Sequence, residues 1–449
     1  MSQINSQTIK NYFLKNFRLQ FWLSDSININ YKEEHQAEHK GLSVLNTHGN
    51  FFSEQIPLDT QDLIFKEWNG RKIPFLFSNH NDENIIDRFH SGIIINYDIL
   101  GSAFYFLSGW QEYTATRTRQ MPLRFAYNKS VQYHLNEPHI PWVNYYFDIF
   151  KTAIELYADI KRVKRKHKRT LFALTHDVDL LFSGWKEESY CHFRKGEFKK
   201  GANILRSRFK SRKYDPWFNL NEIVDFTGTL GFQSSYFMMA SQGKNHGVKH
   251  ADYSLNNNIV RKSLNYIKKK GGEIALHAAT SSCNNINQLT KELNSINSGT
   301  TGIRFHYLAY DVQSTPAVLQ KSGVTYDTTL GFAETIGFRN AITHPFYLFD
   351  ITKNSSTDVI EIPLIIMDRT LQHSKYLNLS PSKTFDTIQP LLEEVRKFSG
   401  AVSILWHNSF LSPCKFKPWS LFFKNLIKQL TQHSNVTRAD EISRIYLMK

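Results

Sequence analysis

From residue 171 onwards, short apolar runs alternate with longer amphipathic segments. The short runs predict buried strands at 171–175, 234–239, 273–276, 302–308, 324–326, 359–362 and 401–406. The longer segments predict helices at 257–270, 286–296, 315–321 and 383–398. This alternation is the pattern of βα units in a parallel sheet, and about seven such units favour a barrel over an open sheet.

The first third of the chain has a different texture. Apolar pieces at 73–77 and 93–97 stand between polar loops, and a helix is predicted over 142–157. A chain of 449 residues exceeds what one hydrophobic core usually organises. We therefore predict an α/β protein with two parts, a smaller accessory α/β domain of unknown role at 1–165 and a βα domain at 166–449.

The composition is that of a globular protein, because 41% of the residues are hydrophobic and 14% are aromatic. Lysine and arginine outnumber aspartate and glutamate by 55 to 40, an excess that favours anionic partners. The excess is concentrated at 161–170 and 194–213, where solvated helix faces or a linker are the favoured interpretation. Nucleic acid is therefore not the expected partner.

The cysteines and the apolar segments bear on location. Cys191, Cys283 and Cys414 are widely spaced and odd in number, which predicts free thiols rather than a disulfide framework. The first twenty residues lack the apolar core of a secretory signal. The apolar stretch at 93–110 is interrupted by polar residues and two glycines, which argues against a membrane span. We expect a cytoplasmic protein.

Polar side chains gather where the predicted strands end, which is the catalytic edge of parallel βα folds. A lone histidine at such a place is more often a satisfied buried residue than a ligand. Chemically active side chains at the ends of four strands favour a site instead. They are His176, Asp177 and Asp179 after the first strand, His277 after the third, Arg304 and His306 late in the fourth, and His407 after the last.

The pair Asp177 and Asp179 can divide its labour, one carboxylate binding a cation and the other accepting a proton, but this spacing also occurs in glycosyltransferases and ordinary turns. The context is more specific. The ordered segments LFALTHDVDLL, GGEIALHAATSS, GIRFHYLAYD, YDTTLGFAETIGFR and ILWHN resemble the polysaccharide deacetylase family of carbohydrate esterases. The resemblance covers about residues 170–449 and is strongest to a branch with an extra N-terminal domain. It implies an irregular (β/α)7 barrel that holds one divalent metal ion.

The same resemblance implies a role for each motif residue. Asp177 corresponds to the catalytic base, Arg304 to the arginine that orients this base, and His407 to the general acid. Asp179 and His277 correspond to metal ligands. Zinc is the expected ion, with other divalent ions left open, and its expected work is to polarise the acetyl carbonyl and activate water.

The chain departs from the family at the second metal histidine, where it has Ser281, four residues after His277. A serine hydroxyl is a poor zinc ligand. His306 replaces a proline of the family motif, and strand alternation would place it on the same side as Arg304. His306 is therefore the predicted third ligand, with Ser281 or water as the alternatives.

Four further residues are weaker candidates. Tyr307 and Trp406 flank the motif residues and are candidates for stacking on sugar rings, although aromatic residues at strand ends more often belong to the core. Asp327 and Arg339 either line the cleft or form a structural ion pair.

The leading hypothesis is a metal-dependent hydrolase that removes an N- or O-linked acetyl group from a carbohydrate, in the biosynthesis of a surface polysaccharide. One alternative is a metal-dependent glycosyltransferase that uses the paired aspartates, which would leave no role for His277, Arg304 and His407. Another alternative is a non-catalytic relative that binds glycans, or that binds nucleic acid through its charge of +15. The oligomeric state is left open.

Overall fold

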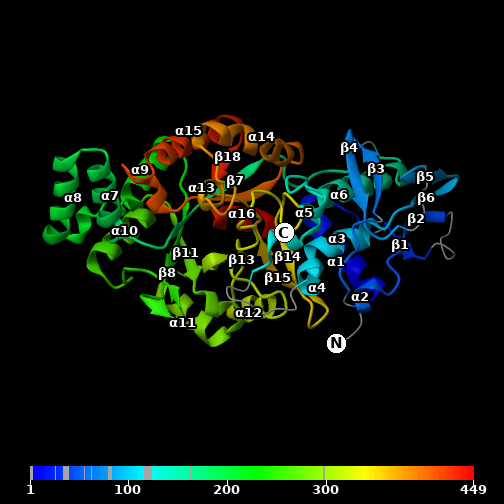
Figure 1. Ribbon diagram of the computed structural model, residues 1–449. Coiled ribbons are helices and arrows are strands. Elements are labelled where there is room, and N and C mark those ends of the chain that lie inside the picture. The colour runs from blue at the N-terminus through cyan, green and yellow to red at the C-terminus, as the bar shows by residue number, and fades with distance from the viewer. Residues whose placement is uncertain are drawn as a thin grey trace.

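A curled mixed sheet covered by helices forms the larger part of the molecule, and a smaller α/β region packs at one end of it (Figure 1). This arrangement confirms the predicted α/β class with an N-terminal α/β region. The domain boundary after residue 165 stays a prediction. The computed structural model describes residues 4–25, 27–33, 40–54, 56–61, 63–78, 83–115, 124–160, 163–245, 247–296 and 299–448.

The N-terminal region is built on a sheet with the order β1-β2-β6-β5, in which β5 alone is antiparallel to its neighbour. The helix predicted over 142–157 is present with those limits as α6. The elements are α1 (Ser6–Gln20), β1 (Ile29–Lys32), β2 (Lys40–Leu45), α2 (Phe51–Glu54), β3 (Ile64–Trp68), β4 (Arg71–Phe75), β5 (Ile86–Phe89), β6 (Ser91–Ile95), α3 (Ile99–Leu107), α4 (Trp110–Ala115), α5 (Val131–His134) and α6 (Trp142–Tyr157).

The strands of the larger sheet lie close to where the apolar runs placed them. The run at 302–308 is shorter as a strand, since it ends at Phe305 and continues in a tight turn where Tyr307 and Leu308 have φ of 57° and 54°. The strands are β7 (Leu171–Val178), β8 (Ser235–Met239), β11 (Glu273–Ala278), β12 (Gly302–Phe305), β13 (Tyr326–Asp327), β14 (Phe346–Asp350), β15 (Ser355–Glu361), β16 (Leu364–Met367), β17 (Ala401–Leu405) and β18 (Asn435–Thr437).

The strand order of this sheet is β14-β15-β13-β12-β11-β8-β7-β17-β16, and β14 and β15 form its one antiparallel pair. β18 adds to the first half of β7. β15 and β16 are linked only through Ile362 and Pro363, so one bent segment pairs with β13 and then with β17. This segment joins the β13 side of the sheet to the β17 side. The sheet therefore curls into a half-barrel, in line with the predicted irregular barrel.

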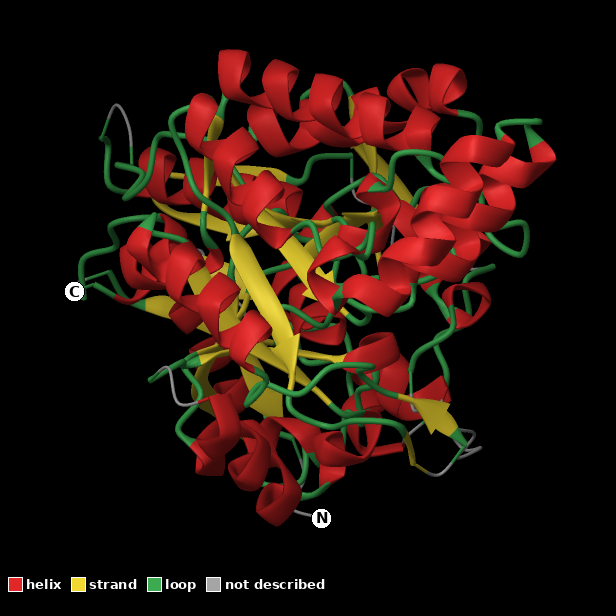
Figure 2. Ribbon diagram, turned by 90° about the vertical axis from the view of Figure 1, so that its left-hand side faces the viewer, coloured by secondary structure: helices red, strands yellow, loops and turns green. Residues whose placement is uncertain are grey.

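Helices cover the outside of the curled sheet (Figure 2). α14 and α15 pack on β7 and β17 through a buried apolar cluster that contains Leu174, Ile404, Leu391 and Phe423. In the described chain, none of the helices has the length and apolar character needed to cross a membrane. The helices are α7 (Gly184–Arg194), α8 (Phe198–Lys210), α9 (Leu220–Thr229), α10 (Asn258–Lys269), α11 (Ile286–Ile296), α12 (Thr315–Ser322), α13 (Asp368–Gln372), α14 (Pro381–Lys397), α15 (Lys417–His433) and α16 (Ala439–Leu447).

The structure corrects the expectation of three free thiols. Cys191 in α7 and Cys414 just before α15 form a disulfide across 223 positions, whereas Cys283 is free and buried. The two cysteines are far apart in the sequence, which argued against a disulfide, but the fold brings their segments together. The disulfide ties α7 to the start of α15.

Candidate active site

The carboxyl ends of the parallel strands surround a cavity of about 220 Å³. The expected convergence of strand ends is therefore present. His176 stands apart, because it is fully buried and its Nδ1 bonds to the carbonyl oxygen of Trp406 at 2.8 Å. The predicted site residues that line the cavity are Asp177, Asp179, His277, His306, Tyr307 and His407.

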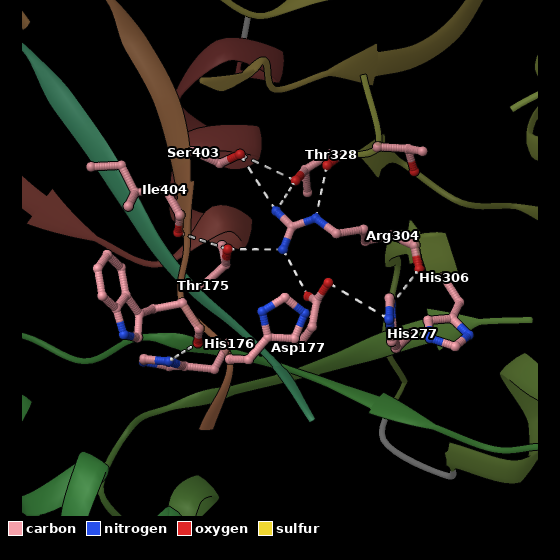
Figure 3. A network of polar contacts seen from close by, with 12 residues as sticks. Thr175, His176, Asp177, His277, Arg304, His306, Thr328, Ser403 and Ile404 are labelled. Atoms are coloured by element: carbon pink, nitrogen blue, oxygen red, sulfur yellow. Dashed lines mark hydrogen bonds and ion pairs between the residues drawn. The ribbon is translucent and has the colours of Figure 1, made fainter. Parts of the chain in front are cut away.

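Arg304, which is not part of the cavity wall, holds Asp177 in place (Figure 3). Its Nη1 donates to Asp177 Oδ1 at 2.8 Å and to the Thr175 hydroxyl at 2.9 Å. Burial raises the pKa of Asp177, but Arg304, followed by His277 and His407, more than offsets that effect and holds the pKa below its ordinary value. Asp177 is thus kept as a carboxylate in one orientation, with Oδ2 lying 3.6 Å from His277 Nε2.

Asp179, His277 and His306 converge on one point. His277 donates from Nδ1 to the backbone carbonyl of Arg304 at 3.0 Å, so its Nε2 faces the cavity. Asp179 Oδ1 lies 3.3 Å from His277 Nε2 and 3.8 Å from His306 Nε2. This oxygen is buried and has no hydrogen-bond partner in the described chain.

These separations fit a shared cation. Zinc ligands at about 2.1 Å in tetrahedral geometry stand about 3.4 Å apart. The three candidate ligand atoms of Asp179, His277 and His306 all lie within 4.8 Å of one another. Burial lowers the pKa of His306 to about 3, which leaves a neutral imidazole with a free lone pair. The donor set therefore suits one divalent metal ion.

Ser281, the alternative third ligand, is engaged elsewhere. Its hydroxyl accepts a hydrogen bond of 2.8 Å from Gln288 Nε2 in α11, and it is not part of the cavity wall. His306 reaches the cavity from the turn that follows β12 rather than by strand alternation. The geometry favours His306 over Ser281.

His306→Ala is expected to weaken divalent-metal binding by on the order of tenfold or more, because only two protein ligands remain. Ser281→Ala is the matched control and is expected to bind metal like the parent protein. Isothermal titration of both variants with Zn²⁺ provides the measurement. Equal affinity of His306→Ala and the parent would assign the third position to Ser281, water or substrate.

His407 faces the same cavity and is held by Asp368, a residue that the motifs did not indicate. The fully buried Asp368 accepts hydrogen bonds from His407 Nδ1 at 2.7 Å and from the His407 backbone N–H at 2.6 Å. The other ring nitrogen, Nε2, lies 3.7 Å from Asp179 Oδ2. Burial lowers the pKa of His407, but Asp368, and after it Asp179 and Asp177, raise it above its ordinary value.

The two aromatic residues predicted to stack on sugar rings, Trp406 and Tyr307, lie in different surroundings. Trp406 is fully buried and packs against Phe422 and Phe423 in the core, so its predicted contact with a sugar is wrong. Its side chain and that of His407, the next residue, point to opposite sides of the chain, as expected for extended backbone. Tyr307 is 49% exposed and lines the cavity, which leaves it available for stacking.

Asp327 and Arg339 neither line the cavity nor pair with each other. Arg339 Nη2 lies 2.6 Å from Glu112 Oε2 of α4, in a buried contact between the two parts of the chain. Asp327 accepts a hydrogen bond from the Thr329 hydroxyl at 2.6 Å and lies beside Glu361. Burial raises the pKa of both carboxyl groups, and the charge of Asp327 raises that of Glu361 further. The pair therefore keeps a proton to a higher pH than two ordinary carboxyl groups would.

Glu361→Gln is expected to change how stability depends on pH. The carboxyl pKa values are raised in the folded state, so between about pH 4 and those raised values the folded protein binds more protons than the unfolded chain, and stability falls as pH rises. An amide N–H replaces the shared proton in the variant. The stability difference should therefore shift in favour of the variant by on the order of 1 to 3 kcal/mol between pH 5 and pH 8. Urea unfolding at both pH values measures the shift, and parallel pH profiles would contradict it.

The N-terminal region contributes to the cavity wall. Arg124 lines the cavity, where its Nη2 lies 3.1 Å from Glu334 Oε1 and 3.3 Å from the Tyr376 hydroxyl. Arg369 and His373 line the same rim. The rim therefore carries hydrogen-bond donors from both parts of the chain around the polar centre.

The similarity of the chain to known proteins is partial. Residues 4–158 match the model of a family of unknown function (DUF7033). No curated protein matches the chain.

Solved structures show a distant likeness. A Mycobacterium smegmatis protein assigned provisionally as a polysaccharide deacetylase is 16% identical, with a TM-score of 0.40, over 62% of this chain and 90% of its own. The peptidoglycan deacetylase PdaC from Bacillus subtilis is 11% identical, with a TM-score of 0.27, over 62% and 91%. Puue allantoinase is 11% identical, with a TM-score of 0.38, over 63% and 91%.

Proposed function

We propose that the protein is a metal-dependent hydrolase that removes an N- or O-linked acetyl group from a carbohydrate. The division of labour between two carboxylates carries the proposal: Arg304 holds Asp177, whereas Asp179 faces His277 and His306. His407 lines the same cavity. A base, a cation site and an acid in one cavity are what hydrolysis of an unactivated amide requires.

The residues have distinct tasks in this proposal. A divalent cation held by Asp179, His277 and His306 would polarise the acetyl carbonyl and lower the pKa of water. Asp177 accepts the proton of the attacking water through Oδ2, because Arg304 occupies Oδ1. His407 donates a proton from Nε2 to the departing nitrogen or oxygen, while Nδ1 stays bonded to Asp368. The products are acetate and a free amine or alcohol on the sugar.

The rim supports a carbohydrate as the acyl carrier. Tyr307 offers a half-exposed aromatic face, and Tyr376, Arg124, Arg369 and His373 offer polar groups. Sites of this kind combine a largely apolar wall with a few fixed polar groups that orient the ligand. Two imidazoles and one carboxylate form a donor set that suits zinc, which is the proposed metal.

Acetate release tests the function. Chelator-treated full-length protein is reloaded with Zn²⁺ or Co²⁺ and incubated with N-acetylated and O-acetylated oligosaccharides. The expected result is acetate release that requires the metal and is matched, on the N-acetylated substrate, by one new amine per acetate. Binding of the oligosaccharide without release would instead identify a non-catalytic glycan binder. Stabilisation by nucleotide sugars in a thermal-shift experiment would favour a glycosyltransferase.

A further inference from the structure

The helices α7 and α8 form a hairpin at the end of the molecule opposite the N-terminal region (Figure 1). Gly201 is the buried residue of α8, and the Phe193 ring packs against it. The base of the hairpin is anchored, because the disulfide between Cys191 and Cys414 and a hydrogen bond of 2.8 Å from the Cys414 N–H to Glu188 hold α7 to the barrel. The hairpin is thus a fixed projection with most of α8 in solvent.

A stripe of exposed apolar side chains runs along one flank of α8. Phe198 is 68% exposed, Leu205 is 39% exposed and Phe209 is 85% exposed. At 100° per residue these three side chains fall within about 40° of one another. Five of the sixteen large hydrophobic side chains that are exposed in the described chain lie in this hairpin and the turn after it, namely Tyr190, Phe198, Leu205, Phe209 and Tyr214. Exposed apolar side chains gathered on one face indicate a contact surface.

Positive charge surrounds this stripe. Residues 194–213 contain nine lysines and arginines and a single acidic residue, Glu197. Lys199, Arg206 and Lys210 lie about 80° to 120° around the helix from the stripe, so they border it on one side. Arg208 stands on the other side, over the Trp185 ring at 4.2 Å. The occupant of the surface must therefore be apolar in its interior and anionic at its boundary.

We propose that α8 docks the protein on an anionic lipid bilayer. A helix with aromatic and leucine side chains on one face and basic side chains beside them lies flat at the boundary between headgroups and acyl chains. The basic side chains are attracted to acidic headgroups while the apolar stripe enters the acyl layer. At thirteen residues α8 is about 20 Å long, which suits a helix lying on the surface rather than spanning it.

Charge argues against the other occupants. A second copy of this face would bring two strongly positive segments together, which is repulsive. A nucleic acid would satisfy the cations through its phosphates but would leave the apolar stripe without a partner. The bilayer matches both features. The proposal uses neither the cavity nor the metal ligands, so it stands or falls independently of the proposed hydrolysis.

Co-sedimentation of the full-length protein with vesicles tests the proposal. Vesicles of phosphatidylcholine and phosphatidylserine in a 3:1 ratio are compared with vesicles of phosphatidylcholine alone, at about 0.1 M salt. We expect at least tenfold stronger binding to the anionic vesicles. Phe198→Ser combined with Phe209→Ser should weaken that binding at least tenfold, as should Arg206→Gln combined with Lys210→Gln.

Matched controls come from exposed residues elsewhere. Leu421→Ser removes an apolar side chain that is 55% exposed on α15, and Lys262→Gln combined with Lys269→Gln removes two exposed charges on α10. Both controls should bind like the parent.

Absence of binding to the anionic vesicles, or equal loss of binding in the variants and the controls, would overturn the proposal. The arginine and lysine changes could weaken vesicle binding while the phenylalanine changes do not, with the protein binding a DNA oligonucleotide as strongly as the anionic vesicles. That result would overturn the proposal in favour of a polyanion site. A concentration-dependent dimer abolished by the Phe changes, without vesicle binding, would overturn it in favour of a second copy.

Discussion

Asp177→Asn is expected to retain divalent metal and to lose roughly 10²- to 10⁴-fold in the rate of deacetylation. The variant keeps the shape of the side chain and its contact with Arg304, but the amide cannot accept a proton from water. Asp179→Asn is expected to lose metal affinity and activity together, because it removes the charge of a ligand whose Oδ1 faces His277 and His306.

Titration with Zn²⁺ and acetate release, carried out on both variants, separate these roles. Thermal unfolding serves as the control for folding, since Asp177 is paired with a fully buried arginine. Equal metal loss in the two variants would contradict the assigned division of labour. Retained activity in Asp177→Asn would remove this residue as the base and leave His407 or a further group in its place.

The fold of the larger part follows from features that the sequence carries locally. Strand β7 begins with the apolar run 171–174, and β17 is apolar except at Ser403, because both faces of these strands are covered. Helices such as 286–296 show the amphipathic period of a helix packed on one side. The bend at Ile362 and Pro363 that links β15 to β16 has no such local signature. It depends on which strands lie on either side of the segment in three dimensions.

The site was predictable as far as it consists of polar residues placed directly at strand ends. Asp177, Asp179, His277 and His407 follow that rule, and they line the cavity. Asp368 follows it too, since it comes directly after the apolar run 364–367. A lone acidic residue after a short apolar run is weak evidence for a site as long as its partner is unknown. Its importance becomes visible only through the two hydrogen bonds to His407.

The remaining differences concern long-range geometry. Trp406 and His407 are adjacent in the sequence, but their side chains lie on opposite sides of the extended chain. Which of the two faces the core and which the cavity is set by how the strand sits in the sheet, and the Trp406 ring is the one in the core. The rim position of Arg124 depends on packing between the two parts of the chain, which sequence periodicity does not encode. The disulfide between Cys191 and Cys414 arises in the same way, from two segments that the fold brings together.

His407→Gln is expected to slow the cleavage of an acetamide by roughly 10²- to 10⁴-fold and that of an activated aryl acetate much less. An amine leaves only after it gains a proton, whereas a phenolate with electron-withdrawing groups leaves without one. Asp368→Asn is the companion variant, because Asp368 acts only through the ring that it holds at Nδ1.

Loss of this contact should produce the same selectivity between the two substrates in weaker form, with metal affinity unchanged. Initial rates are measured on an N-acetylated sugar and on 4-nitrophenyl acetate at equal metal loading. The ratio of the two rates, compared between each variant and the parent, shows whether His407 protonates the leaving group. If His407→Gln slows both substrates equally, the imidazole does not protonate the leaving group. Its contact with Asp179 Oδ2 at 3.7 Å then belongs to metal binding or to structure. A metal titration of the same variant separates these two, because only a ligand role lowers the affinity.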